Sequence, residues 1–150
     1  MAADRWRVFV DTNVLIAGLA SRTGASAAIL DLGEAEEIII MVSRQVLMEA
    51  DRVFLAKFPH LIARYRTFIK SLAPLLADDP TPRAVQAAAQ AIDLDDAPIL
   101  AAAKQEEVDY LVTLNTRHFM TLNVRTFFPG LIVTPAEFLT AFRRFWERPT

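Results

Sequence analysis

Carboxylates at three places in this sequence have the chemistry needed to hold a divalent cation. Asp11 directly follows the apolar run VFV, Glu49 lies within an amphipathic segment, and Asp96 directly precedes APILAAA. Hard cations such as Mg²⁺ and Mn²⁺ prefer oxygen ligands. A cation held in this way acidifies a bound water and stabilises the charge that grows on a phosphate under attack. The leading hypothesis is therefore metal-assisted phosphodiester hydrolysis.

Composition limits the kind of protein that carries these acids. The chain has 150 residues, 53% of them hydrophobic, and a formal net charge of −2. A chain of this length buries about two thirds of its unfolded surface, so we expect a single domain over residues 1–150. Cysteine is absent and the histidines are His60 and His118, which excludes thiolate sites and disfavours a histidine-rich zinc site. A metal must therefore be held mainly by oxygen.

The apolar segments are short. No basic stretch followed by an apolar run opens the sequence, and charged residues interrupt the helix-like runs before they reach membrane-spanning length. We therefore expect a cytoplasmic protein with no membrane segment. The small net charge names no partner, because a nucleic-acid enzyme can gather acids at its metal site and bases at the rim.

Strand-like and helix-like segments alternate along the chain and must position the acids. Expected strands are the apolar runs at residues 6–10, 38–42, 109–113 and 131–133. Expected helices lie at residues 13–20, 25–36, 43–58, 60–76, 83–92 and 135–148, and one more is capped by Asp95 or Asp96. The alternation predicts an α/β domain with a central, mainly parallel sheet between two layers of helices. Asp11 then lies at the carboxyl end of a strand, where such sheets bind ligands.

Four segments in this order resemble the PIN-domain family of ribonucleases, particularly the VapC-type toxins of toxin–antitoxin pairs. They are VDTNVLI from residue 10, VLMEADRV from residue 46, DLDDAPILAAA from residue 93 and DYLVTLNTRHF from residue 109. The closing IVTPAEFL extends the likeness over nearly the whole chain. The resemblance implies a PIN-like three-layer α/β/α domain and a metal-dependent endoribonuclease, the toxin of a type II pair.

The resemblance also assigns roles to individual residues. It makes Asp11, Glu49 and Asp96 the first three acids of the catalytic site, and it places Asn115 where the family has a fourth acid. Asp11 and Asp96, with Glu49 acting through water, would then hold Mg²⁺ or Mn²⁺. An amide oxygen adds no negative charge, so a second ion should bind more weakly beside Asn115.

Each acid also has a simpler structural interpretation. Asp11 can cap the following helix, and Glu49 can be a solvated surface charge. In the cluster of Asp93, Asp95 and Asp96, at least one should be only a cap. Asp95 is the better N-cap candidate, and Asp96 is the position that matches the family. Asp93 can also supply part of the charge that Asn115 lacks.

Other residues are candidates for supporting roles. Asn13, Ser43 and Thr113 lie near strand ends, where they can orient the acids or metal-bound waters, or simply cap the next turn. Arg117 and His118 follow Asn115 and are suited to contact a substrate phosphate, although solvated loop residues are the commoner case. Of the two, His118 is the less favoured for a direct role.

A basic stretch lies between residues 52 and 77, where five cationic side chains occur with no acid. Arg64, Arg66 and Lys70 are candidate contacts to an RNA backbone, since phosphate contacts give affinity without sequence choice. The same stretch can be a solvated helix face or a groove for a partner's helix. Aromatic residues that recur from Phe138 to Trp146 predict core or dimer contacts.

The sequence therefore favours an endoribonuclease that acts on RNA, with an antitoxin partner and a homodimeric state, both implied by the resemblance. The rival hypothesis is a catalytically weak PIN-fold module that binds RNA or protein, for which Asn115 is the main support. A phosphate-accepting receiver domain is disfavoured, because such domains use a lysine late in the sheet and this chain has none after Lys104.

Overall fold

The computed structural model describes residues 5–147 and contains one sheet of five parallel strands. The strands are β1 (Arg7–Val10), β2 (Ile39–Val42), β3 (Leu75–Leu76), β4 (Tyr110–Val112) and β5 (Leu131–Val133). Their order in the sheet is β3-β2-β1-β4-β5, and every neighbouring pair is parallel. In register, Phe9 of β1 pairs with Met41 and with Leu111. Because β1 is central and covered on both faces, its residues 8–10 are fully buried.

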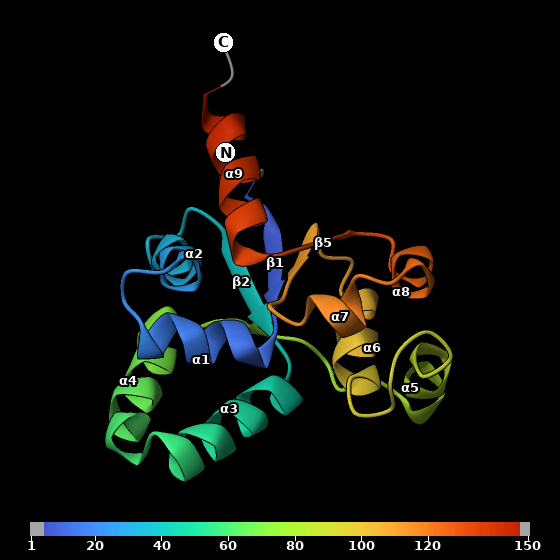
Figure 1. The fold of residues 1–150 in the computed structure, drawn as a ribbon, viewed down its shortest axis with the longest axis horizontal. Helices are drawn as coiled ribbons and strands as arrows, with labels where there is room; N and C mark the ends of the chain where they lie inside the picture. Colours follow the sequence, from blue (N-terminus) through green and yellow to red (C-terminus); the bar gives the residue numbers. More distant parts are fainter. Residues whose placement is uncertain (1–4, 148–150) are drawn as a thin grey trace.

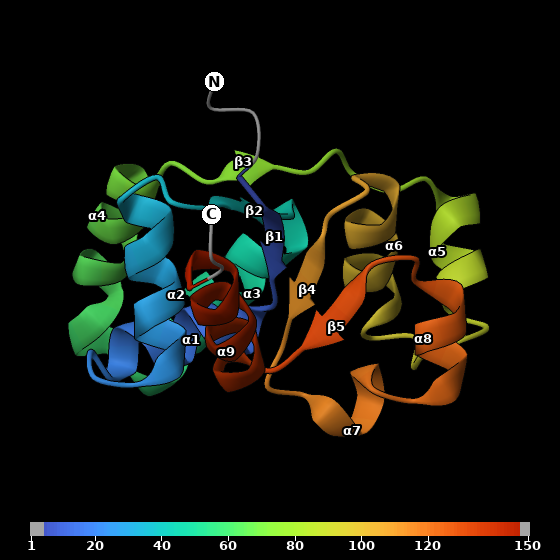
Figure 2. The ribbon, with the colours of Figure 1, turned by 90° about the horizontal axis from the view of Figure 1, so that it is seen from above.

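Helices cover both faces of this sheet. They are α1 (Thr12–Ala20), α2 (Ala25–Glu34), α3 (Arg44–Lys57), α4 (Ile62–Leu72), α5 (Pro82–Ala88), α6 (Ala97–Gln105), α7 (Thr116–Phe119), α8 (Leu122–Phe127) and α9 (Pro135–Trp146), with a 3₁₀ turn at Pro59–Leu61. Figures 1 and 2 show α1, α2 and α4 on one side of the strands and α5, α6 and α8 on the other. The predicted three-layer α/β/α architecture is confirmed.

Helix caps and packing fix where these elements begin. Ser43 caps α3 by accepting a hydrogen bond from the Val46 N–H, as its position after a strand predicts. Thr134 and Glu137 form a reciprocal capping box at the start of α9. The buried face of α9 rests on Trp6, whose ring meets Phe138 at 5.8 Å between ring centroids. Phe138 therefore lies in the core and Phe142 packs against it, as predicted, whereas Phe145 and Trp146 are exposed.

Several boundaries differ from the expectations. The helix expected over residues 60–76 is a 3₁₀ turn followed by α4, which ends at Leu72 because Ala73 adopts a left-handed conformation with φ 47°. The remainder forms the short edge strand β3, and the segment after β4 folds into α7 and α8, which the sequence did not predict. The helix expected to close the chain reaches Trp146, and Arg148 lies outside the described residues.

Membrane-spanning length is also absent from the described helices. Between residues 5 and 147 no single helix is long and apolar enough to cross a bilayer. Taken together, α1 and α2 satisfy the criteria of length and composition, but they meet at an angle of 97°. Both helices bury residues in the core beside the sheet.

Candidate metal centre at the carboxyl ends of β1 and β4

Asp11 is the buried centre of the candidate site. It follows β1 directly, and 5% of its surface is exposed. Its Oδ1 accepts a hydrogen bond from the Thr12 N–H at 2.8 Å, so it does cap α1, while its Oδ2 accepts from Asn13 Nδ2 at 3.2 Å. Burial raises the pKa of Asp11 to about 6, against the lowering effect of the hydrogen bonds from the Thr113 hydroxyl and the Thr12 N–H. A buried carboxylate with this pKa is poised to accept either a proton or a cation.

Thr113 connects Asp11 to the neighbouring strand. Its fully buried hydroxyl donates to Asp11 Oδ2 at 2.8 Å and accepts from the Asn115 N–H at 2.9 Å. Asn13 makes a second link, since its Oδ1 accepts from the Leu114 N–H. Two of the three residues proposed to orient the acids, Asn13 and Thr113, therefore do contact Asp11, and Thr113 reaches it because β1 and β4 are adjacent in the sheet.

Glu49 reaches the site from α3. Its Oε2 accepts a hydrogen bond from the Thr12 hydroxyl at 2.9 Å, and its Oε1 accepts from Gln45 Nε2 one turn earlier at 3.0 Å. The side chain is half-buried, so it is not the solvated surface charge of the simpler interpretation. Its negative charge raises the pKa of Asp11, which places the two carboxylates within electrostatic range.

Asp96 approaches from the start of α6. Asp96 occupies the N-cap position of α6, so the expectation that Asp95 would be the cap is wrong. The Asp96 side chain makes no capping hydrogen bond. The Asp96 side chain is 22% exposed, whereas Asp93 and Asp95 are exposed residues. The charge of Asp96 also raises the pKa of Asp11. Glu49 on α3 and Asp96 at the N-cap of α6 thus both lie within electrostatic range of Asp11, the N-cap of α1.

Asn115 lies beside these acids and serves as the N-cap of α7. Its Oδ1 accepts from the His118 N–H at 3.3 Å, and its Nδ2 lies 3.3 Å from His118 Nδ1. The amide oxygen is therefore occupied by the helix cap. The group that faces the His118 ring is the amide nitrogen, which is a hydrogen-bond donor and has no lone pair for a metal.

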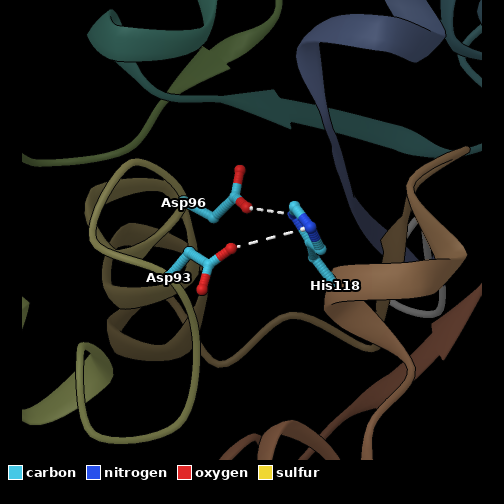
Figure 3. Close-up of side chains that lie close together, drawn as sticks. All are labelled: Asp93, Asp96 and His118. Atoms are coloured by element: carbon cyan, nitrogen blue, oxygen red, sulfur yellow. Dashed lines mark hydrogen bonds and ion pairs between the residues drawn. The ribbon is translucent and has the colours of Figure 1, made fainter.

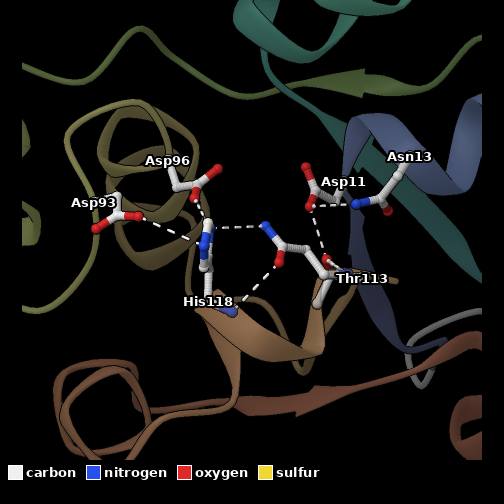
Figure 4. Close-up of polar contacts among 7 residues, drawn as sticks. Asp11, Asn13, Asp93, Asp96, Thr113 and His118 are labelled. Atoms are coloured by element: carbon white, nitrogen blue, oxygen red, sulfur yellow. Dashed lines mark hydrogen bonds and ion pairs between the residues drawn. The ribbon is translucent and has the colours of Figure 1, made fainter.

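His118 contacts two acids that the sequence did not predict it to meet. Its Nδ1 lies 3.0 Å from Asp96 Oδ2, and its Nε2 lies 3.6 Å from Asp93 Oδ2 (Figure 3). Figure 4 shows how these contacts continue the group that begins at Asn13, Asp11 and Thr113. A cap-forming asparagine three residues before a histidine is a local signal for their contact. No local signal joins His118 to Asp96, 22 residues earlier.

The donor set suits a divalent cation of the Mg²⁺ or Mn²⁺ class. Asp11, Glu49 and Asp96 offer carboxylate oxygens, and their mutual repulsion is the kind of electrostatic strain that a bound cation relieves. Among the described residues, the three donors whose ligand atoms lie within 4.8 Å of one another are Asp93, Asp96 and His118, and Asp11 and Glu49 are not members of this compact group. The residues present therefore fit such an ion.

Not every predicted site residue joins this group. The Ser43 hydroxyl is directed to its capping bond with Val46 rather than to an acid. Arg117 is exposed in α7, next to the contacts of His118. Arg64, Arg66 and Lys70 are exposed on α4, which Figure 1 shows across the sheet from α6.

The basic face on α4 borders a groove against α3. Arg66 makes a bidentate ion pair with Asp51, with Nε at 3.0 Å from Oδ1 and Nη2 at 2.9 Å from Oδ2. This pairing partly neutralises the face, which the sequence had suggested was purely basic. The α3–α4 groove has a volume of about 730 Å³. Its lining includes apolar Met48, Leu55 and Ile69 and cationic Arg52, Arg66 and Lys70.

Comparison with known proteins identifies the family to which this architecture belongs. The family model described as PIN domain matches residues 7–117, which span all three acids and Asn115. No curated protein matches the chain.

Solved structures share the fold at low sequence identity. The crystal structure of PAE2754 from Pyrobaculum aerophilum matches with a TM-score of 0.63 and 16% identity, over 96% of this chain and 98% of that one. VapBC2 from Rickettsia felis, bound to a DNA fragment from its promoter, matches with a TM-score of 0.57 and 17% identity, over 85% and 96%. VapC20 of Mycobacterium tuberculosis, a toxin that cleaves the sarcin–ricin loop, gives 0.50 and 17%, over 69% and 86%. The chain belongs to the PIN-domain family.

Proposed function

We propose that this protein is a metal-dependent endoribonuclease and the toxin of a type II toxin–antitoxin pair. The observation that carries the proposal is the buried Asp11 at the end of β1, on which the charges of Glu49 and Asp96 both act. Membership of the PIN-domain family and the fold shared with the toxin VapC20 support the same conclusion.

Each residue has a defined task in this proposal. Asp11 and Asp96 bind Mg²⁺ or Mn²⁺ directly, and Glu49 holds a water of the ion. Thr113 and Asn13 keep the Asp11 carboxylate in one orientation through their hydrogen bonds. A bound divalent ion supplies a more acidic water and stabilises negative charge on the phosphate.

The test is cleavage of a labelled, structured RNA by the purified protein with Mg²⁺, with Mn²⁺ and with EDTA. Asp11→Asn should abolish cleavage. The exposed Asp31→Asn, whose carboxylate pairs with Arg22 on the protein surface, is the matched control and should cut normally. Cleavage that survives EDTA, or that Asp11→Asn retains, would refute the metal-dependent mechanism.

The rival function is a PIN-fold module that binds RNA or protein without strong catalysis. The observation that favours it is the amide at Asn115, which adds no charge and uses its oxygen to cap α7. Calorimetry separates the two functions. A protein that binds neither Mg²⁺ nor Mn²⁺ and cuts no RNA is a binding module.

RNA contacts are proposed at two places. Arg117 is exposed beside Asn115 and is suited to contact the phosphate next to the scissile bond. Contacts by Arg64, Arg66 and Lys70 on α4 stay a prediction. Arg117→Glu should weaken binding of RNA to metal-free protein and flatten its salt dependence. Arg64→Glu, measured for RNA binding in the same way, tests whether bound RNA also contacts α4.

For the antitoxin, the α3–α4 groove is the proposed binding site. Met48 and Leu55 are 56% and 53% exposed, a large apolar area for two neighbouring turns. The cationic rim favours an amphipathic segment that carries acidic residues. Leu55→Asp should prevent a candidate antitoxin from blocking RNA cleavage and leave cleavage itself intact. Leu122→Asp, which alters an exposed residue outside this groove, is the control.

A homodimer is proposed as the working state, on the strength of the hydrophobic excess of the chain. Light scattering coupled to size-exclusion chromatography measures the mass directly. A mass of one chain at micromolar concentration would refute this part of the proposal.

A further inference from the structure

We propose that His118 supplies a nitrogen ligand, through Nδ1, to a cation shared with Asp96, and that Asp93 orients the imidazole from its other side. The inference rests on the proposed metal-dependent function and deepens it, because it assigns to an imidazole the donor role that Asn115 does not fill. An imidazole ligand would also make the site bind Mn²⁺ in preference to Mg²⁺.

The distances suit a shared ion. His118 Nδ1 and Asp96 Oδ2 lie 3.0 Å apart. Two adjacent ligands of an octahedral ion with bonds of about 2.1 Å are themselves separated by about 3 Å. Figure 3 shows the imidazole ring directed toward the carboxylates of Asp96 and Asp93. One ion can therefore bind the ring and Asp96 with little movement of either side chain.

The far side of the ring faces a suitable partner. Ligation through Nδ1 requires the proton on Nε2, and Nε2 lies 3.6 Å from Asp93 Oδ2. The Asp93 side chain is 70% exposed, so a small rotation can shorten this ion-pair distance to a hydrogen bond. Metal-bound histidines usually donate their other N–H to a carboxylate in this way, which fixes the tautomer and makes the ligating nitrogen more basic.

The position of the imidazole is fixed by its own helix. The Asn115 cap accepts from the His118 N–H, and the adjacent Phe119 is fully buried in the core. The imidazole remains accessible, since the His118 side chain is 40% exposed. Asn115 Nδ2 can donate to an unprotonated Nδ1, the form that ligation requires, and a cation would take its place. The backbone at His118 is thus held by the buried Phe119 and the Asn115 cap, while the imidazole is accessible from solvent.

An imidazole ligand has a measurable consequence for metal choice. Nitrogen donors suit Mn²⁺ better than Mg²⁺, whereas a purely carboxylate site discriminates less. We expect wild-type protein to bind Mn²⁺ more tightly than Mg²⁺. His118→Ala should weaken Mn²⁺ binding by about tenfold or more, as loss of a ligand or of its orienting partner does, and should weaken Mg²⁺ binding less.

The decisive experiment is pulsed electron paramagnetic resonance of the full chain loaded with Mn²⁺ alone. Since His60 and His118 are the two histidines, an imidazole ¹⁴N coupling can arise from either, and each can be removed separately. The coupling should be present in wild type and in the control His60→Ala, and absent in His118→Ala and His118→Gln. The glutamine variant keeps a polar side chain, and its thermal melting confirms that loss of signal is not loss of fold.

The outcomes separate this inference from the function on which it rests. Mn²⁺ that binds wild type but not Asp11→Asn, with no imidazole coupling, overturns the role of His118 and leaves the metal-dependent site standing. Mn²⁺ that fails to bind wild type overturns both. Coupling that disappears in His118→Ala and weakens in Asp93→Asn supports the whole arrangement.

Discussion

The hydroxyl of Thr113 donates a hydrogen bond to Oδ2 of Asp11 across 2.8 Å and so joins the ends of two adjacent strands. The same hydroxyl accepts from the Asn115 N–H, which ties the loop after β4 to the same point. One buried oxygen thus positions both the central acid and the residue at the family's fourth acidic position. The geometry of the site depends on a residue that need not touch metal or substrate.

Thr113→Val tests this arrangement, since it preserves shape and removes the hydroxyl. The Asn115 N–H and Asp11 Oδ2 each lose a partner, so we expect the free energy of unfolding to fall by about 1–3 kcal/mol. Metal affinity measured by calorimetry should also fall. Thr140→Val, which removes an exposed hydroxyl bonded to the Ala136 carbonyl within α9, is the control and should change neither quantity. Unchanged metal affinity in Thr113→Val would mean that Asp11 needs no such orientation.

Asp11→Asn should change how stability depends on pH in metal-free protein. Burial raises the pKa of Asp11 from 3.8 to about 6, so the folded state binds this proton more tightly than the unfolded chain. The stability that this proton gives is present at low pH and is lost as the pH rises from about 4 to about 6, a change of about 3 kcal/mol.

The variant lacks this titration but also loses hydrogen-bond acceptance from Thr113 or Asn13. At low pH we expect Asp11→Asn to be less stable than wild type. The difference between the free energy of unfolding of the variant and that of wild type should then change by about 3 kcal/mol in favour of the variant between about pH 4 and pH 7. Urea unfolding of both proteins at several pH values measures this difference. Curves of wild type and variant that remain parallel across this pH range would contradict the raised pKa of Asp11.

Asn115→Asp should tighten binding of Mg²⁺ by about tenfold, because it adds a negative charge beside His118, which itself contacts Asp96. The fold should tolerate the change, since Asp and Asn are equally good N-caps. Calorimetric titration of Mg²⁺ gives the affinity. Asn123→Asp in α8 adds the same charge at an exposed position and should leave the affinity unchanged. If both variants match wild type, Asn115 lies outside the metal site.

Gly130→Ala should destabilise the fold by about 1–3 kcal/mol through steric overlap. A Cβ at this position would lie 2.7 Å from the Val108 carbonyl oxygen, a backbone atom that cannot easily move, just before β5. Gly24→Ala is the comparison without steric overlap, because the nearest atom to its Cβ would be Ser21 Oγ at 4.0 Å, and it should cost only the smaller loss of a glycine N-cap. Chemical denaturation compares the two variants, and equal midpoints would contradict the packing argument.

The sequence alone determined much of this protein, wherever the governing physics is local. Apolar runs predicted four of the strands, and Ser43 was correctly identified as the cap of the following helix. The position of Asp11 at a strand's carboxyl end followed from the same pattern. Burial and capping act over a few residues, so their signals are visible in the order of residue types.

The tertiary structure alone decided which side chains meet. His118 contacts Asp96 from 22 residues away, Arg66 is paired with Asp51, and the residues after Ala73 form an edge strand on β2 instead of continuing a helix. These contacts depend on strand order and helix packing, which bring distant segments together. They correspond to no periodic pattern in the sequence. Residue types predicted a metal centre of carboxylates, and the fold placed an imidazole beside them.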